Sequence, residues 1–510
     1  MSDRIKNIKL HLGDSIIPFL IVSLGMFIIQ LVFMSNLLPW FDEIMFVDTP
    51  IHFLSGDGWT THTWRSQAGE EPMSLYMPLY QFLLTGWMWV FGTSLWACRS
   101  LNLFLTILIG VGLIKLAQRL EINIGKGGAI ILALLLWCTP AMSFMYRNGR
   151  CDLTGAFFCV ILFIQVIDYI KGASKKKWTI ILFAGLIMMA GLQAVVYSTM
   201  IFLLGIVLLK DQRKPLFHSF LWAIVGYIIG FSITALFFLI NGRLLAFFEL
   251  FFGFSTAIRA LAAKLFPYFG PILGLDSEYY MSKLLQSNTM PAPSLAERLL
   301  NIVQNPSYMI LLLVCIIMLC LSYKKIKQSN YNKSVFALLL LGVLIPVLMN
   351  IAGRFVSYYY WMAFLPLMLC ASVLFETENM WYKKSITILA IVVLSIMELR
   401  VITENSHYKT LRTFIKESPF LKGKVIASPS ITIYEVEPLS NKVYYPANLA
   451  ENDLPSHFDY IIIPQCNNVA DKKILQLFET VQSDKSLEVS LVSVCQEPYL
   501  EIYEIKSISQ

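Results

Sequence analysis

The stretch Leu37–Glu43, which reads LLPWFDE, places two adjacent carboxylates, Asp42 and Glu43, directly after a long apolar run. That run, Ser15–Leu38, is longer than the apolar core of a signal peptide and is followed by no small-residue cleavage site, so it predicts an uncleaved membrane anchor. Ionisable groups beside hydrocarbon are costly unless they face water, a metal or a substrate. The acid pair is therefore the first candidate functional feature of the chain.

The composition of the whole chain requires lipid as its main solvent. Of the 510 residues, 57% are hydrophobic and 14% are charged, and the mean hydropathy is +0.64. Soluble proteins carry roughly 25% charged residues. The formal net charge of +7 fits basic loops held against membrane lipids. The sequence contains no dense Lys/Arg tract, which argues against a nucleic-acid partner.

The distribution of basic residues predicts the topology. Three basic residues stand within the first nine positions, so the N-terminus is expected in the cytoplasm and Asp42 and Glu43 outside. Five later basic clusters can all be cytoplasmic only if the apolar run Met77–Val90 does not cross the membrane. That run has about 14 residues, whereas a crossing needs about 20. We therefore expect it to lie along the membrane surface.

The sequence predicts a polytopic α-helical membrane protein with about eleven transmembrane helices. The expected spans lie near 15–38, 99–118, 127–146, 152–170, 178–193, 195–209, 216–240, 308–323, 334–351, 355–375 and 384–400. Residues 1–400 form this transmembrane domain, with extracytoplasmic loops at 39–97 and 241–307. The expected location is the plasma (inner) membrane, with the C-terminus on the extracytoplasmic side.

Residues 401–510 have the composition of a small soluble domain. Strand-like runs at 424–428 and 458–464 alternate with helical patterns at 404–417 and 471–482, and a hairpin is expected over 487–505. We predict a small extracytoplasmic α/β domain. Because it contains no Gly-rich phosphate loop, no catalytic role is assigned to it.

Further charged residues gather on the predicted outer face. Arg150 and Asp152 stand at the outer end of a span, where a basic residue suggests a lipid phosphate as partner, with an internal ion pair as the alternative. Arg259 and Lys264 lie in an aromatic-rich part of the 241–307 loop, which is typical of interfacial helices that present or snorkel cations. Arg354 stands beside an aromatic belt, and we expect it to bind phosphate.

The first outer loop also contains candidate metal ligands. His52, Glu70 and Glu71 share this loop with Asp42 and Glu43, and a divalent cation (Mg, Mn or Zn) takes imidazole or carboxylate ligands. A lone histidine is more often structural, so both interpretations of His52 stay open.

Taken in order, these motifs resemble those of the GT-C membrane glycosyltransferases, particularly the protein O-mannosyltransferase and aminoarabinose (lipid A) transferase group. The resemblance covers about residues 10–375 as a set of short motifs. They are the acid pair after the first span, the stretch Met77-Pro78-Leu79-Tyr80 to Phe91-Gly92-Thr93-Ser94 with Arg99, the pair Arg150-x-Asp152, and Gly353-Arg354-Phe355 through Leu365-Pro366.

The resemblance implies a polyprenyl-phosphate sugar donor, an extracytoplasmic active site and an inverting transfer of a hexosyl or pentosyl group. It assigns Asp42 as the base that deprotonates the acceptor, with Glu43 as its neighbour. Asp152 would support the acceptor or an ion, and Arg354 would hold the donor phosphate. The acceptor would be a lipid, a glycan or a protein.

Two other function classes stay open, a lipid or glycan transporter (flippase) and a non-catalytic membrane scaffold. A transporter is expected to carry charges near the middle of its spans and internal repeats, and neither is visible in the sequence. A scaffold would not require the acid pair at Asp42 and Glu43.

Overall fold

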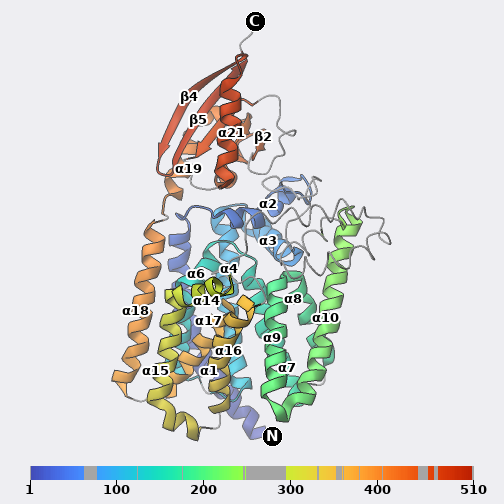
Figure 1. The fold of residues 1–510 in the computed structure, drawn as a ribbon, viewed down its shortest axis with the longest axis vertical. Helices are drawn as coiled ribbons and strands as arrows, with labels where there is room; N and C mark the ends of the chain where they lie inside the picture. The colour runs from blue at the N-terminus through green and yellow to red at the C-terminus, as the bar shows by residue number, and fades with distance from the viewer. Residues whose placement is uncertain are drawn as a thin grey trace.

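The computed structural model describes residues 2–61, 77–122, 124–174, 176–244, 247, 294–329, 332–351, 359, 361–377, 380–404, 406–445, 458–464 and 469–507. A helical bundle and a small sheet domain follow one another along the long axis, and the two termini lie at opposite ends (Figure 1). We call the end of the bundle on which the sheet domain lies the domain end.

Seven of the described helices are long and apolar enough to cross a membrane. They are α1 (Ser2–Met34), α4 (Leu95–Arg119), α7 (Asp152–Ile170), α10 (Arg213–Ile240), α15 (Pro306–Gln328), α16 (Asn332–Ile351) and α18 (Trp381–Glu404). Three shorter apolar helices accompany them, α8 (Lys177–Ala190), α9 (Leu192–Leu208) and α17 (Trp361–Thr377). Together with one bent pair, these helices coincide with the eleven predicted segments.

The bent pair replaces the continuous span that the sequence predicted at 127–146. Helix α5 (Lys126–Cys138) and helix α6 (Pro140–Arg147) meet at an angle of 64°. Thr139 between them has an extended backbone, with φ −86° and ψ 118°. The bend follows from Pro140, because proline disfavours a helical residue before it and starts a new helix well at its own position.

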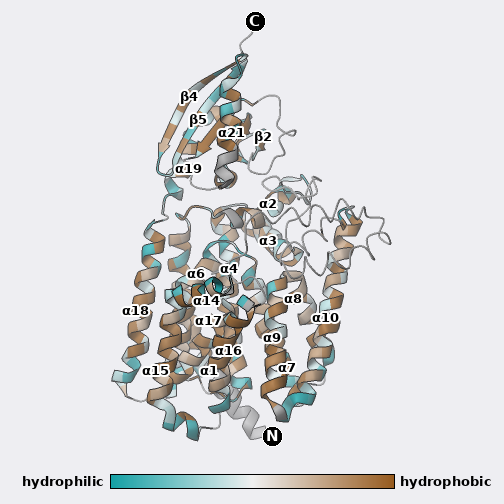
Figure 2. Cartoon of the chain, viewed as in Figure 1, coloured by the Kyte–Doolittle hydropathy of each residue, from teal (hydrophilic) through white to brown (hydrophobic). Residues whose placement is uncertain are grey.

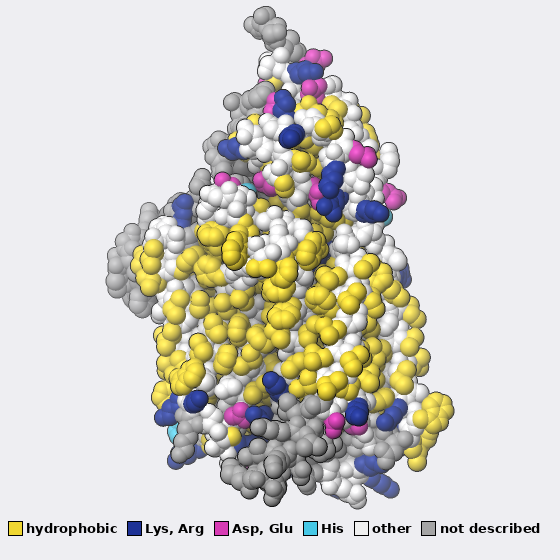
Figure 3. Space-filling view, turned by 180° about the vertical axis from the view of Figure 1, so that it is seen from behind, with side chains coloured by type: hydrophobic (Ala, Val, Ile, Leu, Met, Phe, Trp, Pro, Cys, Tyr) yellow, Lys and Arg dark blue, Asp and Glu magenta, His cyan; other side chains and the backbone are white. Residues whose placement is uncertain are grey.

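The outside of the bundle is apolar along its length. Large hydrophobic side chains such as Ile21, Val32 and Ile240 are more than 60% exposed. In Figures 2 and 3, hydrophobic residues cover the middle of the bundle, and charged residues gather toward its two ends. Such a surface is stable in lipid and not in water, so the chain is a multi-pass membrane protein.

Two short helices, α2 (Phe41–Ser55) and α3 (Pro78–Phe91), lie at the domain end (Figure 1). Helix α3 has 14 residues, which gives a length of about 21 Å against a hydrocarbon core of about 30 Å. It falls on the run expected to lie along the surface. In the predicted 241–307 loop, the structure describes 241–244, 247 and 294–307, including α14 (Leu295–Gln304).

The C-terminal domain is the predicted small α/β domain. Its five described strands are β1 (Val425–Ala427), β2 (Lys442–Tyr444), β3 (Tyr460–Pro464), β4 (Leu487–Gln496) and β5 (Tyr499–Ser507), in the order β2-β1-β3-β5-β4. Strand β1 pairs in parallel with its two neighbours, and β5 is antiparallel to β3 and β4. The helical elements are α19 (Tyr408–Lys416), α20 (Ile433–Val436) and α21 (Val469–Ser483), with 3-10 turns η4 (Pro419–Leu421) and η5 (Ser430–Thr432).

Candidate active site

Helix α2 begins at the acid pair. Its N-cap is Trp40, whose backbone N–H donates to Glu43 Oε2 at 3.2 Å, and Asp42 lies in the first turn. Carboxylates are favourable there because the first turn of a helix carries unpaired N–H groups and positive partial charge. The backbone of Asp42 is described, whereas its side chain lies outside the described atoms.

Glu43 forms a fully buried, bidentate ion pair with Arg99 on α4. Arg99 Nε and Nη2 donate to Glu43 Oε1 and Oε2 at 2.8 and 2.7 Å, and both side chains are 0% exposed. The same guanidinium donates to the carbonyls that end α1 and lead toward α2, those of Met34, Leu37 and Leu38. Through Arg99, Glu43 thus helps to hold together the end of α1, the start of α2 and helix α4, directly beside Asp42.

The predicted Arg150-x-Asp152 motif is an internal ion pair, which was the alternative left open by the sequence. Arg150 Nε donates to Asp152 Oδ2 at 2.7 Å, and both residues are buried. The guanidinium lies over the rings of Trp40 and Phe46, at 5.1 and 5.8 Å from their centroids. The structure therefore brings this motif against the first turns of α2, as a shared site requires.

Gly149 allows this close approach. Its φ is +52°, and a Cβ atom built there would lie 3.0 Å from Cys98 Sγ and 3.1 Å from Glu43 Cγ. Tyr80 on α3 donates its hydroxyl to the Gly149 carbonyl at 2.7 Å. Elements that are distant in sequence therefore converge on the segment that carries the acid pair.

His52, in the last turn of α2, is buried among carboxylates. Its Nε2 lies 3.1 Å from Asp48 Oδ1 and 3.7 Å from Glu437 Oε1, and its Nδ1 lies 3.4 Å from Asp57 Oδ2. Burial is the largest influence and by itself lowers the pKa of His52, but these carboxylates together outweigh it and raise that pKa above its ordinary value.

The predicted metal site has no support in the part of the chain that the structure describes. Among these residues, no group of three or more His, Cys, Asp and Glu side chains has a geometry that could hold a metal ion. Both ring nitrogens of His52 already face carboxylates, and Glu70 and Glu71 lie outside the described residues. We therefore derive no chemical step through a metal.

Three of the predicted phosphate-binding cations, Arg259, Lys264 and Arg354, also lie outside the described residues. A described cation that the sequence analysis did not select is Arg298 on α14, whose Nη1 donates to the Asn350 carbonyl at 2.9 Å. That carbonyl is near the end of α16, which precedes Arg354. Arg298 could have been selected from the sequence, because it lies in the 241–307 loop that was already expected to present cations.

A third buried ion pair was not predicted from the sequence. Arg147 Nη2 lies 3.1 Å from Glu398 Oε2 on α18, and Ser143 bonds to both side chains. Glu398 falls within a predicted span, and an ionisable residue there is itself a signal of a buried partner. The pair fixes α18 to α6, on the same side of the molecule as the acid pair.

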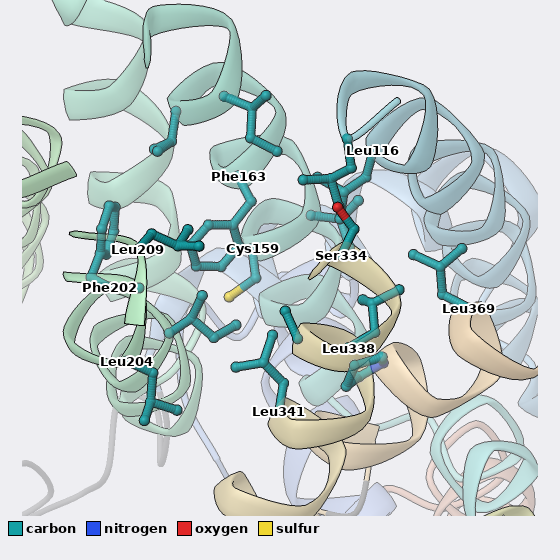
Figure 4. A pocket seen from close by; sticks show the side chains of 18 of the residues that line it. Leu116, Cys159, Phe163, Phe202, Leu204, Leu209, Ser334, Leu338, Leu341 and Leu369 are labelled. Atoms are coloured by element: carbon teal, nitrogen blue, oxygen red, sulfur yellow. The ribbon is translucent and has the colours of Figure 1, made fainter. Parts of the chain in front are cut away.

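An apolar groove of about 270 Å³ lies between α4, α7, α9, α16 and α17. Figure 4 shows side chains such as Leu116, Phe163, Phe202, Leu338 and Leu341 directed into it. Its lining follows α9 from Tyr197 to Leu209, just past the end of the helix. It is the kind of surface that accepts a hydrocarbon chain.

Comparison with known proteins identifies the fold through solved structures. No family model matches the sequence, and no curated protein sequence matches it. ArnT from Cupriavidus metallidurans bound to undecaprenyl phosphate aligns with a TM-score of 0.55 and 10% identity, over 96% of this chain and 98% of that one.

Two further solved structures align at similar levels. The Archaeoglobus fulgidus oligosaccharyltransferase in the apo form aligns with a TM-score of 0.50 and 11% identity, over 87% of this chain and 69% of that one. The mycobacterial arabinofuranosyltransferase AftD aligns with a TM-score of 0.50 and 11% identity, over 96% of this chain and 40% of that one.

These likenesses show that the chain has the GT-C fold of membrane glycosyltransferases, as the sequence motifs predicted. Among the three, ArnT is the one that matches over almost the full length of both chains. An identity near 10% establishes a shared fold and does not transfer an activity or the role of a residue.

Proposed function

We propose that this chain is a glycosyltransferase that moves a sugar from a polyprenyl-phosphate-linked donor to an acceptor hydroxyl or phosphate at the extracytoplasmic face of the plasma (inner) membrane. The observation that carries the proposal is the alignment over nearly the whole chain with ArnT, whose solved structure holds undecaprenyl phosphate. The buried convergence of the acid-bearing helix with Arg150 and Asp152 supports a site at the domain end.

In this mechanism Asp42 is the general base. Its carboxylate takes the proton of the acceptor while the acceptor oxygen forms a bond to the anomeric carbon. The bond from that carbon to the donor phosphate breaks on the opposite face, which inverts the configuration and releases polyprenyl phosphate. The second acid of the motif, Glu43, holds α2 through Arg99, and Asp152 supports the acceptor.

The leaving phosphate needs positioned cations, because negative charge develops on it as the sugar departs. We assign this role to Arg354, Arg259 and Lys264 in the outer segments, with Arg150 contributing from the paired motif. A donor whose leaving group is a lipid phosphate needs no nucleotide site, in agreement with the absence of a Gly-rich phosphate loop from the sequence.

The apolar groove supports a lipid donor. Its lining runs along α9 and is almost entirely hydrocarbon, so it can solvate part of a polyprenyl tail while the phosphate lies at the domain end. The proposed orientation, with a cytoplasmic N-terminus and an extracytoplasmic C-terminal domain, rests on the basic residues at the end of the bundle opposite that domain.

The test is an assay of the purified full chain in lipid nanodiscs with polyprenyl-phosphate sugars and a panel of lipid, glycan and peptide acceptors. Asp42→Asn is expected to lower turnover by about 100-fold or more, because it removes the base. Glu479→Gln makes the same acid-to-amide change on the exposed side of α21 and should leave turnover unchanged.

Unchanged turnover in Asp42→Asn would remove Asp42 as the base. A wild-type chain that consumes none of these donors, but moves lipid-linked sugars between the two leaflets, would replace the transferase by a transporter. Both measurements use the same preparation. Its thermal unfolding profile is recorded beside them and shows whether a sample without activity is folded.

A further inference from the structure

The C-terminal domain contacts the helix that carries Asp42. Its short element η5 packs against α2, and Glu437, directly after α20, reaches His52 on α2. The sequence assigned this domain no catalytic role, because it lacks a phosphate loop. Its side chains nevertheless approach α2 near both of its ends.

Tyr434 on α20 approaches the first turn of α2. It is 6% exposed, and its hydroxyl is buried. The hydroxyl lies against the Cys98 thiol on α4 and interacts electrostatically with Glu43 and Arg99. The C-terminal domain therefore packs beside Cys98, the residue that precedes Arg99 of the ion pair that anchors α2.

Glu437, directly after α20, approaches the last turn of α2. Its Oε1 lies 3.7 Å from His52 Nε2 and accepts a hydrogen bond from the Tyr445 hydroxyl at 2.9 Å. Glu437 and Tyr445 are both largely buried. Tyr434 and Glu437 are three residues apart, so a single short segment reaches both ends of α2.

A third contact holds the chain that leads into α2. The backbone N–H groups of Tyr408 and Lys409 each donate to Asn36 at 2.9 Å, one to its carbonyl and one to Oδ1. Tyr408 in turn donates its hydroxyl to Glu435 Oε1 at 2.7 Å, which ties this contact to α20. Helix α2 and its approach are thus held by one connected part of the domain.

We propose that the C-terminal domain is a structural part of the active site, with Tyr434 and Glu437 as positioning residues that hold α2, and with it Asp42, in the geometry for proton abstraction. This inference rests on the proposed glycosyl transfer. Neither side chain is assigned to touch the substrate. A displacement of about 1 Å in a catalytic group can cost 100-fold in rate, so the support of α2 has a measurable consequence.

The experiment compares three variants of the full chain, Tyr434→Ala, Tyr434→Phe and Phe458→Ala. Phe458 is a buried aromatic residue of the same domain, but it belongs to a separate core that does not include α20. Tyr434→Ala is expected to lower kcat by about 10- to 100-fold, with KM for the lipid-linked donor unchanged. Tyr434→Phe keeps the packing and loses only the contact of the hydroxyl with the Cys98 thiol, so most of the turnover should return.

Hydrogen exchange of the α2 peptide gives a readout besides activity. Exchange over residues 41–55 should be faster in Tyr434→Ala than in the wild type, and unchanged in Phe458→Ala. Glu437→Gln keeps the size of the side chain, weakens its attraction to His52 and should speed exchange toward the C-terminal end of α2.

Wild-type turnover and wild-type exchange in Tyr434→Ala would overturn the proposal. An equal loss in Phe458→Ala would also overturn it, because the effect would then report the general stability of the domain. A wild-type chain without transferase activity, or an unaffected Asp42→Asn variant, would instead reject the proposed function, and the exchange comparison would still decide whether the domain holds α2.

Discussion

At the domain end of the bundle three described arginine–carboxylate pairs are buried and one, Arg400–Glu404 at the end of α18, is exposed, whereas both described ion pairs at the opposite end are at least partly exposed. The buried pairs are Arg99–Glu43, Arg147–Glu398 and Arg150–Asp152, and none of their side chains is more than 6% exposed. The solvated pairs are Lys171–Glu121, at 41% and 70% exposed, and Arg119–Asp168, at 43% and 15%.

The difference shows at which end of the bundle the cost of burying charges is tolerated in return for a fixed geometry. Removing two charges from water costs several kcal/mol for each ion, and their attraction offsets this cost only when the geometry is good. Exposed pairs contribute about 0–1 kcal/mol and hold nothing firmly. The domain end therefore carries costly, well-aligned pairs around the acid-bearing helix, while the opposite end carries ordinary surface charges.

The largest effect is expected from Arg99→Met. The substitution leaves the buried Glu43 carboxylate without its partner and removes the donor to three backbone carbonyls. Breaking a buried pair on one side costs about 3–5 kcal/mol. We expect this loss in the free energy of unfolding, measured in mixed micelles of mild detergent and dodecyl sulfate.

The matched control is Arg119→Met, which removes a partly exposed arginine at the opposite end of the same helix. Its cost should stay within about 1 kcal/mol. Equal losses in the two variants would contradict the distinction between the two ends.

Local sequence patterns predict the apolar spans and most of the strands, but they do not predict the buried contacts at the domain end. The apolar spans follow from the thickness of the bilayer, so their positions can be predicted from hydropathy alone. Most of the C-terminal strands follow from their local pattern of hydrophobic residues. Strand β2 was not predicted, because its sequence Lys442-Val443-Tyr444 contains one aliphatic residue, whereas β1, of the same length, is the apolar run Val425-Ile426-Ala427.

The site itself depends on contacts that no local pattern encodes. The motifs that carry Asp42 and Asp152 were selected from sequence, but the partners of Glu43, Arg147 and Cys98 lie 56, 251 and more than 300 residues away. A residue such as Tyr434 has no signature, because its relevance comes only from packing between the domain and the bundle.

An intermediate effect is expected from Gly149→Ala at the domain end, compared with Gly172→Ala at the opposite end. Both glycines have a left-handed backbone, with φ of +52° and +69°. A new Cβ meets Cys98 and Glu43 at Gly149 and nothing within 4 Å at Gly172. The backbone term is about 1–2 kcal/mol at each position, and overpacking adds about 1–3 kcal/mol at Gly149 alone.

The measurement is the loss in the free energy of unfolding of each variant. Subtracting the loss of Gly172→Ala from that of Gly149→Ala cancels most of the backbone cost that the two share. A difference near zero would mean that the loop before Arg150 yields without cost. The Arg150-x-Asp152 motif would then be less firmly held against α2 than its contacts imply.

The smallest effect is expected from Lys171→Gln, which removes the solvated pair with Glu121. The two atoms are 2.7 Å apart, as close as those of the buried pairs, so distance alone would predict a similar contribution. Water and salt screen this pair, however, and ordering two long side chains costs entropy. The free energy of unfolding should change by less than about 0.5 kcal/mol, and this small change should shrink further between low and high salt. A loss above about 1 kcal/mol, independent of salt, would show that burial is not what separates the two ends of the bundle.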